Sequence, residues 1–543
     1  MQKYLLSAQN VSWLIFSFIS AFIILFWYVG FDGFYFYDDY TYSLYAYQFS
    51  EGKFSISDDI FSHRFMVFIP TAILYLIFGI NDYSTILWPL IGALCSVALV
   101  FYLLKSDPFR AAIAVVLLGL CFYPLFFSNK LYPDTVVSFF SFFSVCILFK
   151  ASDDKYLSKS CAFVFSVFCA FLSKETVIYF FPFYLIIFIS DILSGLNKKF
   201  WISVAAFALL LFSAYFICYK IYTGSFFFRF EAIESGHYAF PLSYYHRTFT
   251  EIIPRLTYEP LLMLLGSEMI IPLIISIPYL FNFRFRHLKD IRTDAGFWPV
   301  LVITLLLMIW FGSTSLHHYN PVSLLPRMFI LLMPPIVVLA SVSLADFLLI
   351  TSKLMFVAVL FSICSVLAYF VNDKVYLIYC ILTGIFMTLF FLHRKLVNGK
   401  FKMVLPFLLM GTLCLHPLYT MFKPTQTGYA SEKKIINEYL KRKEGVNLVV
   451  ADPQLCSGYL YYYKFKPDGH YKFLNYKQLS ASDLKADRYF VLMNKYSFDL
   501  FHSMGDPYPA CYSEKPENWK LIGENGNVKL YEAGSLEEVK AGF

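Results

Sequence analysis

Charged residues are scarce in this chain. Only 15% of its 543 residues are Asp, Glu, Lys or Arg, whereas 59% are hydrophobic and 21% are aromatic. No water-soluble fold needs such an excess of apolar side chains. The formal net charge of +7 is scattered through connecting segments, unlike the concentrated basic surface of a nucleic-acid-binding protein. The composition therefore excludes an ordinary soluble domain and gives no sign of nucleic acid as a partner.

Three catalytic signatures are also missing. The chain has no Gly-rich phosphate-binding loop, no His-Glu-x-x-His motif and no Gly-x-Ser-x-Gly motif. ATP-driven transport, zinc proteolysis of that type and α/β-hydrolase chemistry therefore lack the residues that would carry them. Internal repeats and low-complexity tracts are absent as well.

Apolar runs of membrane-spanning length follow one another through residues 1–421. The first run is longer than a signal-peptide core and no small-x-small cleavage site follows it, so we expect a retained helix. The pattern predicts an all-α polytopic membrane bundle. Its approximately thirteen transmembrane helices are expected at residues 11–29, 85–104, 111–127, 135–150, 160–172, 176–192, 200–219, 261–281, 297–312, 328–349, 353–371, 375–392 and 402–420.

One apolar segment, 65–80, is too short to be counted with these helices. It contains Pro70, and at about 1.5 Å per residue it reaches only about 24 Å of a hydrocarbon core of about 30 Å. If it does not cross and the N-terminus is cytoplasmic, the cytoplasmic loops hold about 17 Lys and Arg against about 10 outside. If it crosses, the cytoplasmic loops hold about 9 Lys and Arg and the outer loops about 18. We therefore expect an interfacial or re-entrant helix, with loops 30–84 and 220–260 on the outer face.

Residues 422–543 have a different character and predict a small soluble α/β domain, which the same topology makes extracytoplasmic. A charged helix is expected at 431–444, with strands at 446–451, 489–493, 519–522 and 528–531. Nine of the eleven cysteines lie in apolar runs, but Cys456 and Cys511 lie in this domain. In an oxidising compartment these two could form one disulfide, a question that the sequence leaves open.

Acidic residues gather in the first outer loop. Two adjacent pairs, Asp38-Asp39 and Asp58-Asp59, stand among many aromatic side chains. A carboxylate held in such surroundings suits a general base for a hydroxyl group. The alternative is a solvated acidic loop beneath an aromatic belt. Paired aspartates also permit a divalent metal without requiring one, so the sequence predicts no cofactor with certainty.

Other charges occur where the membrane makes them costly. Asp134 stands at the mouth of a predicted span, and Lys174 and Glu175 interrupt two short apolar runs. Such residues normally face a protein-lined or aqueous cavity, although a structural Lys174 to Glu175 pair is the alternative. Arg327 at an outer helix entrance is suited to binding a phosphate, or else to anchoring the helix at the interface. The adjacent His317 and His318 lack a metal-ligand spacing and support no prediction.

Taken in order, these segments resemble the C-type integral-membrane glycosyltransferases that use polyprenyl-phosphate sugars. The resemblance is closest to bacterial relatives of the dolichyl-phosphate-mannose protein mannosyltransferases and to the lipid A aminoarabinose transferases, in glycosyltransferase families 39 and 83. The motifs that carry it are the acidic pair at 38–39, His63-Arg64-Phe, Leu76-Ile-Phe-Gly79, Leu131-Tyr-Pro-Asp134, Leu172-Ser-Lys-Glu175 and Leu325-Pro-Arg327. The commonest acidic pair in the family is Asp-Glu, and its frequent Lys-Pro-Pro is Arg64-Phe-Met here, which leaves the donor and acceptor class open.

The resemblance implies an inverting transfer of a hexosyl or pentosyl group from a polyprenyl-phosphate donor to an acceptor hydroxyl. Asp38 would be the general base, with Asp39 as the alternative base or as a ligand of a substrate hydroxyl. The residues that would bind the donor phosphate are Arg64, Lys174 and Arg327, and those that would orient them or the sugar are Asp134 and Glu175. The acceptor is a lipid, a glycan or a protein.

The implied location is the bacterial inner membrane, with a cytoplasmic N-terminus and an extracytoplasmic C-terminal domain. Two other classes fit the composition. A polytopic transporter or lipid-linked sugar flippase would also carry charges in a helical bundle, but related halves with broken helices are not evident in this chain. A scaffold that presents its C-terminal domain to envelope partners is the third interpretation.

Overall fold

The computed structural model describes residues 7–543 apart from 36, 240–242, 245–246, 282, 284–290, 316, 372–373, 397–400, 424–426, 441–444, 468, 482–484, 504 and 506. The chain forms two compact units. The first comprises Met1–Gly30, Ile56–Val67 and Trp88–Phe422, and the second comprises Phe31–Ser55, Phe68–Leu87 and Lys423–Phe543. The second unit thus includes parts of the first predicted outer loop in addition to the C-terminal residues.

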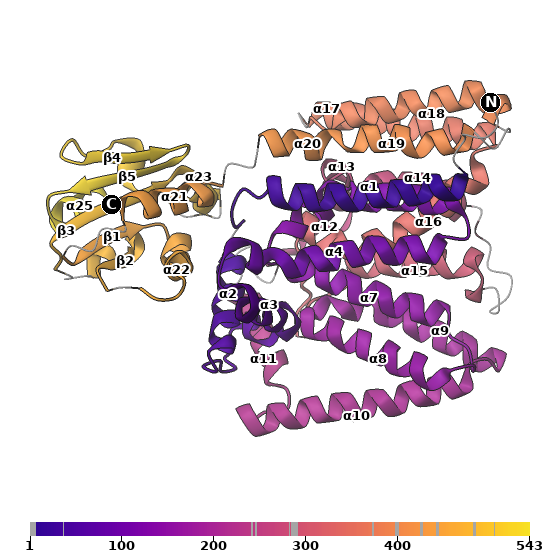
Figure 1. Cartoon of the computed structure of the whole chain (residues 1–543), viewed down its shortest axis with the longest axis horizontal. Helices are drawn as coiled ribbons and strands as arrows, with labels where there is room; N and C mark the ends of the chain where they lie inside the picture. Colours follow the sequence, from indigo (N-terminus) through magenta and orange to yellow (C-terminus); the bar gives the residue numbers. More distant parts are fainter. Residues whose placement is uncertain are drawn as a thin grey trace. The chain divides into compact units, whose positions relative to one another are not determined.

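The first unit is a bundle of apolar helices. Within the described residues, ten helical segments are long and apolar enough to cross a membrane, or up to 12 if each of two bent pairs counts as one span. Figure 1 shows the long helices of the bundle, among which α7 contacts α8, α8 contacts α10, and α17 contacts α18. The ten segments are Ala8–Val29, Asp82–Leu104, Tyr156–Ser173, Glu175–Ser194, Lys198–Thr223, Asp294–Phe311, Pro326–Phe347, Thr351–Phe370, Tyr376–His393 and Lys402–Phe422.

The predicted membrane bundle is confirmed, with corrections to individual spans. The expected spans 111–127 and 261–281 are not straight. Pro108–Gly119 (α5) and Phe122–Asn129 are bent by 64°, and Glu259–Gly266 (α13) and Ile270–Leu280 (α14) by 118°. The span expected at 135–150 is α7, Pro133–Phe149, a shorter apolar helix of 17 residues. The segment expected not to cross forms α3, Phe65–Phe78, whose 14 residues reach only about 21 Å.

The other helices of the bundle complete its framework. Short 3-10 turns, labelled η, precede several of them. Proline stands in the first turn of α7, α9, α16 and α19, where its φ is already helical and its missing donor is not needed. The bounds are α1 Ala8–Val29, α4 Asp82–Leu104, α6 Phe122–Phe126, η2 Phe127–Asn129, α8 Tyr156–Ser173, η3 Glu175–Phe180, α9 Phe181–Ser194, α10 Lys198–Thr223, α11 Phe228–Ala239, α12 Phe249–Leu256, α15 Asp294–Phe311, η5 Pro326–Leu332, α16 Met333–Phe347, α17 Thr351–Phe370, α18 Tyr376–Leu396, η6 Phe401–Val404, α19 Leu405–Leu413 and α20 Leu415–Phe422.

The C-terminal residues build a five-stranded sheet in the order β2-β1-β3-β5-β4. Strands β1, β2 and β3 are parallel, whereas β3, β5 and β4 pair antiparallel. The four predicted strands are present, and the sequence analysis missed β2. The bounds are β1 Asn447–Ala451, β2 Tyr471–Asn475, β3 Arg488–Asn494, β4 Lys520–Asn525, β5 Val528–Ala533, α21 Tyr429–Tyr439, α22 Pro453–Tyr462, η7 Tyr476–Ala481, α23 Lys495–Ser503, α24 Ala510–Ser513 and α25 Leu536–Gly542.

One face of this sheet carries a hydrophobic core around Trp519, Val491 and Cys511. Cys456 and Cys511 are both free cysteines, so the possible disulfide is not formed in this structure. The predicted helix 431–444 corresponds to α21, and residues 441–444 of that prediction lie outside the described residues.

Helix α2, Tyr37–Ser50, packs against α22 inside the second unit. The Tyr40 and Tyr462 hydroxyls form a short hydrogen bond, and both phenols are buried. Gly458 is required in this contact, because a Cβ there would meet the Tyr40 ring at 2.7 Å. Nearby, Lys433 Nζ forms a salt bridge of 2.5 Å with Asp82. The acidic first turn of α2 is therefore held by residues far away in the sequence.

Two carboxyl groups meet in the interior of the sheet domain. Glu432 of α21 and Asp452 after β1 are both fully buried, and Asn494 Nδ2 donates to Glu432 Oε1 at 2.9 Å. Burial, followed by the neighbouring Asp452, raises the pKa of Glu432 well above its usual value. Glu432 therefore keeps its proton at pH values at which an exposed glutamate has lost it.

This pair makes the domain's stability depend on pH. A raised pKa in the folded state contributes stability below the unfolded pKa of about 4.3, and this contribution is lost as pH rises through the folded pKa. Glu432→Gln imitates the protonated acid. We expect this variant to be about as stable as the native chain at pH 5 and to become progressively more stable than the native chain as the pH is raised. Hydrogen exchange of β1 amides in the purified full-length protein measures this. Parallel pH profiles for the two proteins would contradict it.

Candidate active site

A buried ion pair lies where α8 ends. Lys174 has an extended backbone between α8 and η3, and its Nζ lies 2.5 Å from Asp134 Oδ1. Both side chains are buried. Asp134 occupies the first helical turn of α7, directly after Pro133. The break in the apolar run therefore pairs Lys174 with an acid in the first turn of the neighbouring helix, and not with Glu175 as the structural alternative supposed.

Glu175 instead pairs with Arg64. The Arg64 Nη2 lies 3.0 Å from Glu175 Oε1 and 3.2 Å from Oε2. Arg64 is buried and follows the short helix η1, Ile60–His63. Arg64 and Glu175 are 111 positions apart in the sequence. Their pairing connects the residue that directly precedes α3 to the break after α8.

Arg327 lies near these pairs. It stands in the first turn of η5 after Pro326, and its guanidinium lies 4.6 Å from the centre of the Tyr132 ring. Lys174 Nζ lies 3.0 Å from the Sδ atom of the next residue, Met328. Four charged side chains act on Lys174 electrostatically, namely Asp134, Arg327, Arg64 and Glu175. Five predicted site residues, Arg64, Asp134, Lys174, Glu175 and Arg327, therefore form one cluster.

The acidic pair belongs to the second unit. Asp38 and Asp39 occupy the first turn of α2, and both are buried. Asp39 Oδ2 accepts a hydrogen bond of 3.0 Å from the Tyr35 amide, which fixes its orientation. Carboxylates are favoured at a helix N-terminus because the backbone amides there are unpaired. The solvated acidic loop considered as the alternative is therefore wrong for this pair.

Two residues beside the cluster, His63 and Arg229, were assigned no catalytic or binding role in the sequence analysis. His63 Nδ1 lies 2.8 Å from Tyr219 Oη. Burial, followed by the charge of Arg229, lowers the pKa of His63 to about 4, and Arg64 acts in the same direction. The imidazole is therefore neutral at pH 7. His63 and Arg229 lie in different loops, so no spacing in the sequence relates one to the other.

The histidines near Arg327 stay outside this arrangement. His317 and His318 donate through their backbone amides to Ser315 Oγ at 3.3 and 3.2 Å. Throughout the described part of the chain, no group of three or more His, Cys, Asp or Glu side chains could hold a metal ion. The metal predicted as possible from paired aspartates therefore receives no support from the described ligands.

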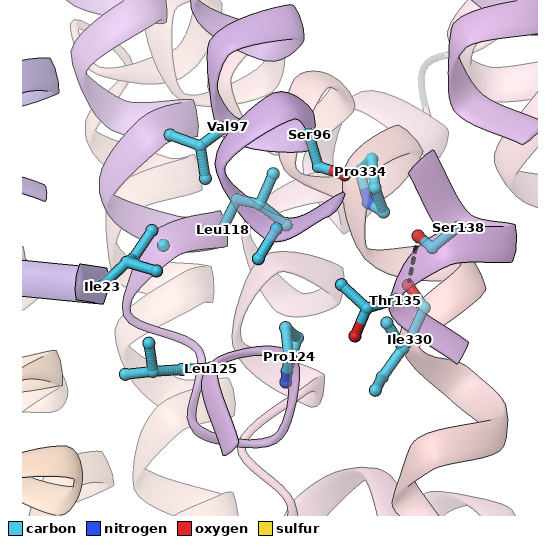
Figure 2. Close-up of a pocket in the computed structure, with 12 residues that line it drawn as sticks. Ile23, Ser96, Val97, Leu118, Pro124, Leu125, Thr135, Ser138, Ile330 and Pro334 are labelled. Atoms are coloured by element: carbon cyan, nitrogen blue, oxygen red, sulfur yellow. Dashed lines mark hydrogen bonds between the residues drawn. The ribbon is translucent and has the colours of Figure 1, made fainter. Parts of the chain in front are cut away.

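An apolar cavity adjoins the segments that carry Asp134 and Arg327. Thr135 of α7, which follows Asp134, and Ile330 of η5, three residues after Arg327, contribute to its wall. Figure 2 shows Ser138 Oγ donating to the Ile330 carbonyl, at 3.3 Å. Ser96 and Thr135 likewise donate to backbone carbonyls. The hydroxyl groups are thereby satisfied, so the cavity presents mainly apolar surface.

Comparisons with known proteins identify the fold. Residues 62–217 match the family model described as dolichyl-phosphate-mannose-protein mannosyltransferase. The crystal structure of ArnT from Cupriavidus metallidurans bound to undecaprenyl phosphate superposes with a TM-score of 0.61 at 12% sequence identity, covering 96% of this chain and 98% of that one. The chain has the fold of the C-type membrane glycosyltransferases. The apo state of the same ArnT gives a TM-score of 0.56, also at 12% identity, with 96% and 99% covered.

The resemblance inferred from the motifs is thereby confirmed. The family match begins at residue 62, so it includes Arg64, Asp134, Lys174 and Glu175 and leaves out the acidic pair. Curated protein sequences provide no match to the chain. The C-type fold accounts for the mainly helical membrane domain followed by a small sheet domain.

The Lys174–Asp134 pair permits a direct test of its energetic role. Removing one partner of a buried ion pair leaves the other charge uncompensated and typically costs about 3–5 kcal/mol, whereas replacing both by apolar residues costs much less. We expect Lys174→Met and Asp134→Leu each to lower the thermal stability of the purified protein strongly. The double variant should recover a large part of the loss. Additive losses in the double-mutant cycle would show that the two residues do not depend on one another.

Proposed function

We propose that this chain transfers a sugar from a polyprenyl-phosphate donor to an acceptor hydroxyl, with inversion at the anomeric carbon. The observation that carries the proposal is the cluster of Arg64, Lys174 and Arg327 within a bundle of apolar helices. A polyprenyl phosphate combines an anionic group, which suits the cations, with a long apolar chain, which suits the apolar surroundings. The undecaprenyl phosphate bound by the similar ArnT structure supports the same donor class.

The proposed reaction exchanges one bond for another at the anomeric carbon. The acceptor oxygen forms a bond to this carbon from the face opposite the leaving group, while the bond to the phosphate oxygen breaks. Asp38 takes the proton of the acceptor hydroxyl, and Asp39 is the alternative base or a ligand of a substrate hydroxyl. One carboxylate is sufficient for such a displacement, unlike the two that retaining hydrolysis requires.

The cationic cluster supplies the second element of the mechanism. The departing polyprenyl phosphate develops negative charge, and fixed cations in a water-poor site stabilise it. Arg64 and Lys174 are held in place by Glu175 and Asp134, so these acids orient the cations. Arg327 presents a planar fork of donors that suits phosphate oxygens. The proposal assigns no step to a metal or cofactor and leaves metal dependence open.

The sugar and the acceptor class stay open in this proposal. Hexosyl and pentosyl donors are both compatible with it, as are lipid, glycan and protein acceptors. We place the reaction on the outer face of a bacterial inner membrane, with the N-terminus in the cytoplasm and the C-terminal domain outside. The charge distribution of the predicted loops supports this topology.

Substitution of the proposed base tests the mechanism. Asp38→Asn keeps the size of the side chain and removes its basicity, and general-base catalysis typically contributes about 10²–10⁴-fold in rate. We expect a loss of this size in the transfer of labelled sugar from lipid-linked donors to membrane acceptors, measured in reconstituted vesicles. Asp58→Asn is the matched control, because Asp58 is an exposed acid of the same loop. Full activity of a folded Asp38→Asn protein would overturn the assignment of the base.

The same assay separates transfer from transport. A flippase or transporter would move the lipid-linked sugar across the vesicle membrane and leave it intact. A glycosyltransferase releases the sugar to an acceptor and leaves polyprenyl phosphate behind. Binding of donor to the purified protein without any loss of its sugar to added acceptors would favour the transporter or the scaffold.

The proposed topology has its own test. Alkaline phosphatase fused after Phe543 should be active in a bacterial host, because this enzyme requires export to form its disulfides. A fusion placed after Lys353, in a predicted cytoplasmic loop, should be inactive. The opposite pattern would place the C-terminal domain in the cytoplasm.

A further inference from the structure

Arg229 is a buried cation to which the mechanism assigns no role. It lies at the start of α11, and only 1% of its surface is exposed. Its guanidinium donates to the Phe171 carbonyl at 2.5 Å and to Tyr215 Oη at 3.3 Å, and it covers the Phe171 ring at 4.0 Å. All of these partners are neutral. They hold the side chain in place without compensating its charge.

Arg255 shows what a purely structural buried arginine looks like in the same bundle. It is fully buried, and its Nε, Nη1 and Nη2 all donate to backbone carbonyls, including those of Val322 and Trp310. By contrast, the Nε of Arg229 is buried with no hydrogen-bond partner among the described residues. A guanidinium Nε and its neighbouring Nη form the edge that binds oxyanions in a bidentate manner.

The charge of Arg229 is also unmatched. Within the described residues, Arg64 has Glu175 and Lys174 has Asp134, but no carboxylate forms a salt bridge with Arg229. A buried charge without a counter-charge is costly, so such groups are normally paired or bind a ligand. The Phe171 carbonyl near the C-terminal end of α8 offers only a partial negative charge.

His63 completes the surroundings of this cation. The His63 ring lies 5.7 Å from that of Phe228, the residue before Arg229, and Arg64 follows His63 directly in the chain. Tyr219 contacts its Nδ1, and the Tyr219 ring lies 4.7 Å from that of Tyr215, the hydroxyl partner of Arg229. A neutral imidazole in this position can hydrogen-bond to an anion without adding a third positive charge to the interior.

We propose that Arg229, with His63 beside it, forms a second oxyanion-binding site that takes a phosphate group. This site differs from the Arg64, Lys174 and Arg327 cluster in its partners, because neutral groups hold Arg229 whereas Glu175 forms a salt bridge with Arg64. The phosphate comes either from the lipid carrier or from an anionic acceptor. The inference concerns binding alone, so it is tested without sugar transfer and can fail or succeed separately from the proposed function.

Phosphate binding to the purified full-length protein provides the test. Isothermal titration with inorganic phosphate is compared for the native chain, Arg229→Gln and Arg229→Lys. Loss of a charged hydrogen-bonding group in a buried site should weaken binding about tenfold or more in Arg229→Gln, and Arg229→Lys should retain more of it. Arg247→Gln is the matched control, because Arg247 is an exposed arginine of the same outer loop and should leave binding unchanged.

Two further arms distinguish the source of the phosphate. Undecaprenyl phosphate in lipid nanodiscs is compared with the uncharged polyprenol. If Arg229→Gln weakens binding of undecaprenyl phosphate as strongly as that of inorganic phosphate, the carrier supplies the group. If only inorganic phosphate is affected, an anionic acceptor supplies it. Both results support the site.

A purely structural Arg229 would give a different result. Arg229→Gln would then lower the melting temperature and bind phosphate as tightly as the native chain, and this outcome would overturn the proposal. If both variants fail to fold, hydrogen exchange on the native protein decides. Added phosphate should then protect the amides of residues 228–236, whereas unchanged exchange would refute the site.

Discussion

The cost of placing charge in a membrane interior governs this structure. A charged side chain there has to find a partner, so each one connects two segments of the chain. Lys174 and Asp134 connect the end of α8 to the start of α7. Near the predicted cytoplasmic ends of the helices, Arg292 forms a salt bridge with the fully buried Asp191 of α9 and donates to the Leu148 carbonyl of α7 at 2.5 Å. Polar pairs near both ends of α7 therefore specify its neighbours, which apolar packing alone would specify poorly.

The same cost explains why the cations of the candidate site are suited to binding. Arg64 and Lys174 are each held by one acid, so they are oriented before any ligand arrives. Preorganised charge of this kind stabilises a developing anion without reorganisation during the reaction. Arg229 is held by a carbonyl and a phenol instead, and it keeps its full charge for a ligand.

The acidic pair is positioned by different means. Asp38 and Asp39 begin α2, which packs on α22 through the Tyr40 and Tyr462 hydroxyls and the closely approaching Gly458. More than 400 residues separate these partners in the sequence. A proposed catalytic base therefore depends for its position on a helix of the C-terminal domain.

The sequence by itself determined the membrane bundle, the four predicted strands and the identity of the charged residues, because apolar length and strand alternation are local properties. It missed β2, whose mixed sequence Tyr-Lys-Phe-Leu-Asn lacks clear alternation. It also missed the two bent spans, since a bend such as that at Glu268, with φ of 62°, changes direction without interrupting the apolar run. Only the tertiary structure decided which charges pair. Glu175 follows Lys174 in the chain yet pairs with Arg64, because the extended backbone at Lys174 separates the two neighbours and partners are chosen by proximity in space.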